Sequence, residues 1–412
     1  MKPKFKKFLR FFCLIYFLSC HTSVKKWEKT IFAKKKKEKM KVLRFFAFLL
    51  LAFYSNAMFS KDYEFLWGVD ANTVFDNREG DQTYSPQQTI FFSRLSPSIG
   101  VKFLGEHKLV AGTHYIQPIG IGYKENKFIP TAYYTFSHKV VKEEKRDSSV
   151  LRIDGTNTPD FKVWSVSFGM IPRRLSYRLP EILWSDSMDY YNPNIRGILL
   201  QCTKNNLVFH EISLDWRSLQ SADQREAFNV NYNVRKYFDR YLRGISPFFI
   251  GGNAQLNHLA KRNPAPEGEG VNDDMFAYPY IGLDFSDKTV FDRFRIKAGY
   301  AVSFDRCRAI GDWEVDGGLL ADFTLQWKKI GVKETFYAGD RQFPLYPMYG
   351  SLLNMGDPHY QSSVYSKTSV YSPIVENRYV SFGASLDFHV TKEGTSCYQK
   401  VYLNVNLGNV DN

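Results

Sequence analysis

"RYVSFGASLDFHV" (residues 378–390) alternates apolar and polar side chains along its whole length. One face carries Val380, Phe382, Ala384, Leu386, Phe388 and Val390, and the other carries Tyr379, Ser381, Gly383, Ser385, Asp387 and His389. Successive side chains of a β-strand point to opposite faces, so this period of two predicts a strand with one apolar and one polar surface. The same pattern recurs in "RFRIKAGYAVSF" (293–304) and "EAFNVNYNVRK" (226–236).

The length of these runs indicates the class of sheet. They extend for about ten residues, whereas strands of soluble sheets average about 5–6. A tilted strand that crosses an outer membrane needs about 9–11 residues, with apolar side chains outside and polar ones inside. Aromatic residues make up 17% of the chain, which suits girdles at the membrane interfaces. We therefore predict an all-β, antiparallel transmembrane barrel over residues 61–412.

Sixteen candidate strands lie between residues 63 and 408. If the first strand runs outward, the even-numbered connections are periplasmic, and most of them are tight turns. The odd-numbered connections are extracellular and include the long segments 173–195, 260–274 and 340–361. Short periplasmic turns and long outer loops are typical of outer-membrane barrels. The segment 141–160 is an exception, because it is long yet even-numbered, so either it extends its neighbouring strands or the count is wrong by two there.

The N-terminus reads as a targeting sequence. Residues 40–57, "MKVLRFFAFLLLAFYSNA", combine a basic start, a short apolar core and small residues before a cleavage site at Ala57. Residues 1–39 then precede the native start at Met40 as a mis-assigned extension. A lipoprotein acylated at Cys20 is the alternative. Localisation in the outer membrane of a Gram-negative bacterium follows from export and the strand pattern.

The charge of the chain is concentrated in this N-terminal region. The formal net charge is +13, and residues 1–60 carry 15 Lys/Arg against 2 Asp/Glu, so the remainder of the chain is neutral. This distribution gives no support for nucleic-acid binding. Three cysteines remain after residue 60, at positions 202, 307 and 397, and their spacing supports neither a disulfide framework nor a metal site.

The segment 173–195 is the third extracellular loop by this count, and it interrupts the alternation with charged and aromatic residues. In general porins this loop folds inward and narrows the channel, where opposed charges select solutes. The predicted binding residues of such a constriction are Arg173, Arg174, Arg178, Glu181, Trp184, Asp186, Asp189, Tyr190, Tyr191 and Arg196. The alternatives are a solvated loop and a cap outside the mouth. The segment 337–360, with Asp340, Arg341 and Asp357, is expected to form a packed cap or to bind ligand.

Several stretches carry a family resemblance. They are "WGVDANTVFDNREGDQ", "FGMIPRR…WSDSMDYYNPNIRGILLQ", "LDWRSLQSADQREAF", "YPYIGLD", "YAGD…PLYPMYG" and "GDPHY". Together they resemble a family of uncharacterised outer-membrane β-barrel proteins of Bacteroidota. The resemblance implies a porin-like barrel over nearly all of residues 63–408 and implies no substrate.

The predicted function is passive diffusion of small polar solutes, with sugars as one candidate. The first alternative is a closed barrel with a binding or assembly role at the cell surface, and the second is an outer-membrane lipid-modifying enzyme. No GxSxG motif occurs, and histidines such as His114, His210 and His389 read as polar wall residues, so the chain is predicted not to be an enzyme. No cofactor or metal site is predicted, and "DPHY" is a single feature. The expected partners are outer-membrane lipid, lipopolysaccharide and a small solute, and an oligomer is compatible with the sequence.

Overall fold

The computed structural model describes residues 63–120, 125–142, 160–205, 207–238, 247–286 and 289–410. The predicted extension 1–39, the signal peptide 40–57 and most of the segment 141–160 lie outside these residues. The strands are β1 (Tyr63–Gly80), β2 (Gln88–Phe103), β3 (His107–Pro118), β4 (Lys127–Lys142), β5 (Asp160–Pro172), β6 (Asn194–Lys204), β7 (Val208–Ser218), β8 (Ala227–Tyr237), β9 (Phe248–Leu259), β10 (Asn272–Asp284), β11 (Arg293–Cys307), β12 (Glu314–Trp327), β13 (Ile330–Gly339), β14 (Val364–Glu376), β15 (Val380–Thr391) and β16 (Thr395–Gly408).

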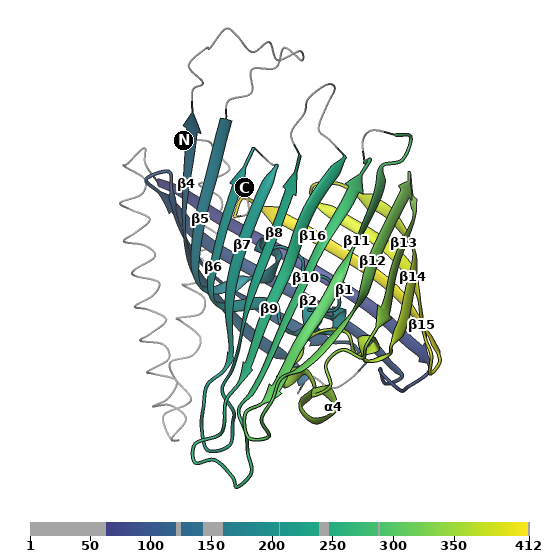
Figure 1. Cartoon of the computed structure of the whole chain (residues 1–412). Coiled ribbons are helices and arrows are strands. Elements are labelled where there is room, and N and C mark those ends of the chain that lie inside the picture. Colours follow the sequence, from purple (N-terminus) through teal and green to yellow (C-terminus); the bar gives the residue numbers. More distant parts are fainter. Residues whose placement is uncertain are drawn as a thin grey trace, which may run out of the picture. The chain divides into compact units, whose positions relative to one another are not determined.

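These strands form one closed antiparallel barrel in which each strand pairs with its neighbours in sequence (Figure 1). The ring closes where β1 pairs with β16, from Gly68 opposite Gly408 to Gly80 opposite Ser396. The predicted count of sixteen strands is confirmed. β4 pairs directly with β5, from Ala132 opposite Met170 to Lys142 opposite Asp160. Closure leaves no sheet edge with unpaired backbone groups, which a membrane requires.

The two faces of the wall follow the predicted alternation. On β15, Leu386 and Phe388 are exposed on the outer surface, whereas Asp387 and His389 are buried inside. On β5, Trp164 and Phe168 are likewise exposed outside. An apolar outer surface and a polar inner surface are the arrangement that suits a barrel in lipid.

The connections differ between the two ends of the barrel. Even-numbered connections include tight turns such as residues 104–106, where Leu104 and Gly105 adopt left-handed backbone angles. The end of the barrel that bears the odd-numbered connections has longer connections, and some of them contain short helices. These are η2 (Arg173–Leu175), α3 (Asp186–Tyr191), α4 (Tyr346–Tyr349), η3 (Gly350–Leu352) and η4 (Pro358–Gln361). None of the helices in the described ranges is long and apolar enough to cross a membrane.

The lumen contains packed side chains. The connection 173–193 and the connection 340–363, which we together call the plug, contribute Ile182, Leu183, Phe343 and Tyr360 to a buried cluster. The other members come from the inner wall and are Phe249, Phe276, Tyr278, Tyr280, Ala301, Leu320, Tyr337 and Tyr365. Polar wall residues are covered as well, because Asn229, Asn231, Asn257 and Asp274 are at most 1% exposed. In a wide water-filled lumen such side chains would be solvated.

Candidate functional site

The connection 173–193 contacts the wall on the far side of the barrel. Glu181 Oε2 lies 2.7 Å from Lys367 Nζ on β14, and its Oε1 lies 3.2 Å from Lys333 Nζ on β13. Asp186 Oδ2 lies 2.6 Å from Lys400 Nζ on β16. β13 and β14 are eight strands away from β5 and β6 in a ring of sixteen, so they lie opposite the base of this loop. The loop therefore extends across the lumen.

Charges in this contact are balanced. Asp387 on β15 joins the group, with its Oδ2 2.8 Å from Lys400 Nζ and 3.7 Å from Lys367 Nζ. Three carboxylates, those of Glu181, Asp186 and Asp387, thus face three ammonium groups, those of Lys333, Lys367 and Lys400. Burial opposes ionisation of Glu181, but the charges of Lys333 and Lys367 outweigh it and lower the pKa of Glu181 to about 2.

The base of the loop is fixed to the near wall. Arg173 Nη2 lies 2.5 Å from Asp215 Oδ2 on β7, and its guanidinium stacks 3.7 Å from the centre of the Trp184 ring. Trp184 Nε1 donates a hydrogen bond of 2.6 Å to Asp189 Oδ1. Arg174 Nη2 lies 2.9 Å from an oxygen of Asp70 on β1. These contacts hold both ends of the loop.

Backbone hydrogen bonds join the two parts of the plug. Ser185 N donates to Met355 O at 2.8 Å, and Asp357 N donates to Glu181 O at 2.9 Å. Gly356 lies between them, where a Cβ atom would stand 2.1 Å from Ile182 O. Only glycine allows this approach without a shift of the backbone.

An acid–imidazole cluster lies where the plug meets the wall. The motif "DPHY" begins η4, with Asp357 as its N-cap and Pro358 in the first turn, a favourable start for a helix. This turn brings Asp357 Oδ1 to 2.6 Å from His359 Nδ1. His389, on the inner face of β15, lies beside them, with its ring centre 4.6 Å from that of His359. Burial opposes ionisation of Asp357, but its interaction and hydrogen bond with His359, together with its interactions with His389 and Lys367, outweigh burial and keep its pKa below the usual range.

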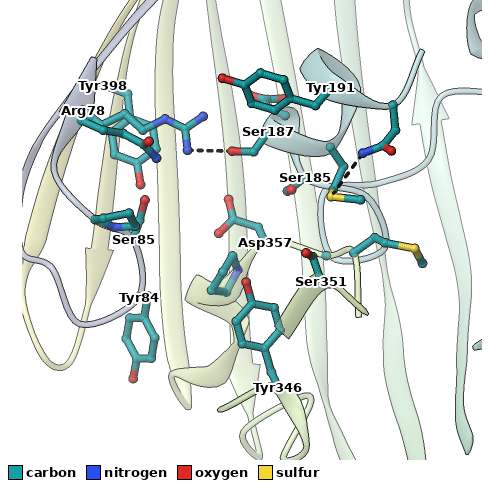
Figure 2. Close-up of a pocket in the computed structure, with 18 of the residues that line it drawn as sticks. Arg78, Tyr84, Ser85, Ser185, Ser187, Tyr191, Tyr346, Ser351, Asp357 and Tyr398 are labelled. Atoms are coloured by element: carbon teal, nitrogen blue, oxygen red, sulfur yellow. Dashed lines mark hydrogen bonds between the residues drawn. The ribbon is translucent and has the colours of Figure 1, made fainter. Parts of the chain in front are cut away.

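A cavity of about 600 Å³ opens next to this cluster. Asp357 and His389 line it together with Ser85, Ser187 and Tyr398. Figure 2 shows Asp357 at the edge of the hollow, with Ser187 above it and Tyr346 below it, and a hydrogen bond between Ser187 and Arg78. Its lining comes from strands and from the odd-numbered connections between β1 and β2, β5 and β6, and β13 and β14.

Cations predominate around the cavity. Six Lys and Arg residues line it, against the two carboxylates of Asp186 and Asp357: Arg78, Lys127, Arg196, Arg217, Lys367 and Lys400. Among them, Arg217 has two buried donors, Nε and Nη2, for which the described residues supply no hydrogen-bond partner. The cavity is therefore suited to an anionic ligand.

The residues predicted for a constriction are brought together only in part. Glu181 and Asp186 face the opposite wall, while Arg173, Trp184 and Asp189 contact one another at the base. Of the rest, Tyr190 donates a hydrogen bond of 3.1 Å to Asp76, Arg178 lies 3.4 Å from Asp186, and Tyr191 and Arg196 line the cavity. Whether the set binds a solute stays a prediction.

Sequence reasoning missed the wall residues that complete this site. Lys367, Lys400 and Arg217 lie on strands, where single charges read as ordinary inward-facing positions. The sequence pattern predicts only a polar wall residue at His389, and the fold places this side chain beside Asp357. The one usable signal was that these residues occupy the polar face of their strands.

These features define the class of the protein. The chain is a porin-like β-barrel of the outer membrane of a Gram-negative bacterium, with a plug in its lumen and a polar cavity beside it. The chain belongs to the lipid A 3′-O-deacylase-type family, whose model matches residues 59–409. The predicted membership in a family of outer-membrane barrels is confirmed to this extent, and an origin in Bacteroidota stays a prediction.

The family overturns one prediction made from the sequence. The sequence alone predicts that the chain is not an enzyme, but the family is described as a deacylase type, which indicates an enzyme, so this prediction is wrong. The expectation depended on the lack of a local GxSxG motif. The acid–imidazole cluster has no such local signature, because its members come from a loop and from a separate strand.

Comparison with solved structures gives distant similarities of fold. OprD from Pseudomonas aeruginosa is 7% identical with a TM-score of 0.46, covering 85% of this chain and 96% of that one. OprB from Pseudomonas putida is 6% identical with a TM-score of 0.42, covering 84% and 94%. OmpF from Salmonella typhi is 10% identical with a TM-score of 0.42, covering 84% and 97%. No curated protein matches the chain.

Proposed function

We propose that this chain is an outer-membrane esterase that removes a 3′-O-linked acyl chain from lipid A. The observation that carries the proposal is the cluster of Asp357, His359 and His389 beside the cavity of about 600 Å³. In ester hydrolysis, water adds to the carbonyl carbon, the acyl C–O bond breaks, and the released sugar oxygen takes up a proton. A buried carboxylate–imidazole cluster can assist by accepting the proton of the water and returning it to the leaving oxygen.

The position of the cavity supports a lipid substrate of the outer leaflet. Its lining includes residues of three odd-numbered connections. Tight turns mark the periplasmic end of outer-membrane barrels, and the longer connections mark the outer end. The cavity thus lies toward the side of the membrane on which lipid A resides.

The charge of the cavity supports the same substrate class. Lipid A carries phosphate groups on its sugar backbone, and arginine side chains bind phosphate through paired N–H donors. Arg217 has two buried donors without a partner in the described part of the chain. Arg196 Nη1 donates a hydrogen bond of 3.1 Å to the backbone carbonyl oxygen of Arg217. These two arginines form a cationic wall that could hold a phosphate while the ester reaches the cluster.

Passive diffusion of small polar solutes is the second candidate, favoured by the polar inner face of the barrel. The burial of Asn229, Asn257 and Asp274 beneath the plug indicates that any water-filled path through the lumen is narrow. Planar-bilayer recording of the folded protein tests this candidate. A large, permanent conductance would support diffusion as the main activity.

The esterase proposal is tested with refolded protein and lipid A in mixed detergent micelles, with products identified by mass spectrometry. The wild type should release one 3′-linked acyl chain, and replacement of the histidine that lines the cavity, His389→Gln, should lower kcat by about 10²–10⁴-fold, the usual contribution of a general acid–base group. His210→Gln is the matched control, because His210 is a histidine of β7 outside this cluster, with its Nδ1 2.9 Å from Tyr232 Oη. Intact lipid A after incubation with the folded wild type, or equal rates for both variants, would refute the proposal.

A further inference from the structure

We propose that Asp357, His359 and His389 form a binding site for a divalent transition-metal ion of the Zn²⁺ type. The inference rests on the proposed function and refines it, because a metal ion held by these residues, and not a free imidazole, would then activate the attacking water. Metal binding itself can be measured without any hydrolysis.

The donor set fits such an ion. One ligand atom from each of the three residues lies within 4.8 Å of the other two. Two imidazoles and one carboxylate are a common set of protein ligands for catalytic zinc, and they leave a fourth position for water. Zn–N distances of about 2.0–2.1 Å place neighbouring ligand atoms about 3.3 Å apart, so a small rotation of the side chains would complete the site.

His389 supplies a second, independent observation. Its side chain is buried, and its Nε2 atom has no hydrogen-bond partner among the described residues. Its Nδ1 atom lies 2.8 Å from Tyr365 Oη. When Nδ1 carries the proton and donates it to that oxygen, Nε2 presents a free lone pair beside Asp357. Hydrogen bonding at the second nitrogen is the usual way in which proteins orient a metal-ligating histidine.

The two lysines nearest to the cluster are each paired with carboxylates. Lys367 is paired with Glu181 at 2.7 Å, and Lys400 is paired with Asp186 at 2.6 Å and with Asp387 at 2.8 Å. Because these ammonium groups are neutralised by carboxylates, Asp357 remains as the net charge of the cluster. The Asp357 carboxylate can offset part of the charge of a divalent ion, and the two imidazoles can supply lone pairs when they are in their neutral form.

The plug holds the ligands in place. Asp357 caps η4 by accepting a hydrogen bond of 3.1 Å from His359 N, and its own N–H donates to Glu181 O at 2.9 Å. The His359 ring stacks on Tyr365 with 5.3 Å between the ring centres. A preformed set of ligands loses little side-chain entropy when a metal binds.

The test uses the full chain, refolded in detergent with a chelator, freed of the chelator and titrated with Co²⁺ as the probe. We expect one Co²⁺ per chain, with the visible d–d absorption of a four- or five-coordinate ion. His389→Ala and Asp357→Asn should each lower the Co²⁺ affinity by about 100-fold or more, since even outer-shell changes lower metal affinity about 10–100-fold. His210→Ala is the control, because that histidine also contacts a tyrosine hydroxyl across a strand pair.

The outcomes separate this inference from the proposed function. Co²⁺ binding that is absent, or equally strong in His389→Ala and His210→Ala, overturns the metal site. If His389→Ala does not fold, the isosteric Asp357→Asn decides, with folding followed by the heat-dependent mobility of the barrel on gels. Hydrolysis of lipid A that persists in chelator refutes the role of the metal in activating the water but leaves the esterase intact. Specific Co²⁺ binding without hydrolysis under any condition supports the site and refutes the esterase.

Discussion

Replacement of Lys367 by methionine should release the plug while the barrel stays folded. Lys367 Nζ lies 2.7 Å from Glu181, 3.7 Å from Asp387 and 4.0 Å from Asp186, and the side chain is buried. Loss of one partner of a buried ion pair costs about 3–5 kcal/mol, because the other charge stays buried and uncompensated. Since Lys333 still reaches Glu181 at 3.2 Å, we expect the lower end, about 3 kcal/mol.

This free energy acts on the position of the plug, because the hydrogen bonds between strands do not involve the lysine side chain. About 3 kcal/mol changes an equilibrium by roughly 100-fold, so the fraction of time with the plug displaced should rise by that factor. Single-channel recording in planar bilayers measures it as the fraction of time spent in a conducting state.

Two further variants control this experiment. Arg293→Met removes a solvent-exposed pair with Glu376 at 3.4 Å, which is worth about 0–1 kcal/mol, and it should leave the closed fraction unchanged. The double variant Lys367→Met with Glu181→Leu should regain much of the closure, because it leaves no buried charge of this pair uncompensated, and Lys333, which loses Glu181, is 38% exposed to solvent. A Lys367→Met protein as closed as the wild type would refute the assignment of these ion pairs as the contacts that hold the plug.

Three further predictions concern the plug and the cavity. Gly356→Ala would place a Cβ atom 2.1 Å from Ile182 O and should lower the stability of the plug by about 1–3 kcal/mol. Limited proteolysis measures this loss as increased cleavage within residues 340–363. Gly252→Ala is the control and should have little effect, because the nearest atom to its Cβ would lie 3.6 Å away. Arg217→Met should raise the KM for lipid A by about tenfold or more and change kcat little, because a charge-assisted hydrogen bond contributes about 1.5–3 kcal/mol. An unchanged KM would exclude a role of Arg217 in binding the lipid. The pKa of Glu181 is lowered from 4.5 to about 2, so the contribution of its carboxylate to plug stability is complete above pH 4.5 and is lost as the pH falls toward 2. The conductance of the barrel should therefore rise only between pH 4.5 and 2. Opening of the channel near neutral pH would contradict this prediction.

The barrel itself could be predicted because its sequence signal is local. Alternation along residues 378–390 fixes which side chains of β15 face lipid, and consecutive strands of an antiparallel barrel pair with each other. Turn length then separates the two ends by parity. The position of residues 173–193 as the third outer connection follows from this counting alone.

The site could be predicted only in part, because it depends on contacts between distant parts of the chain. The pairing of Asp186 with Lys400 joins residues 214 positions apart, and the strand pattern shows only that Lys400 faces inward. Likewise, His389 approaches "DPHY" because the connection 340–363 folds into the lumen and does not form a cap outside. The direction in which a loop folds is set by apolar packing of residues such as Ile182 and Phe343, which no local period reveals.

The contact between Glu181 and Lys367 has a consequence for assembly. These residues are 186 positions apart, and the lysine lies on the fourteenth strand of sixteen. The loop is synthesised and its flanking strands can pair well before its anchor exists, so the contact can form only after the C-terminal strands have joined the sheet. Closure of this contact therefore marks a late stage of maturation, and a chain truncated before β14 would lack Lys367 and Lys400 and would keep Lys333 as the lysine partner of Glu181.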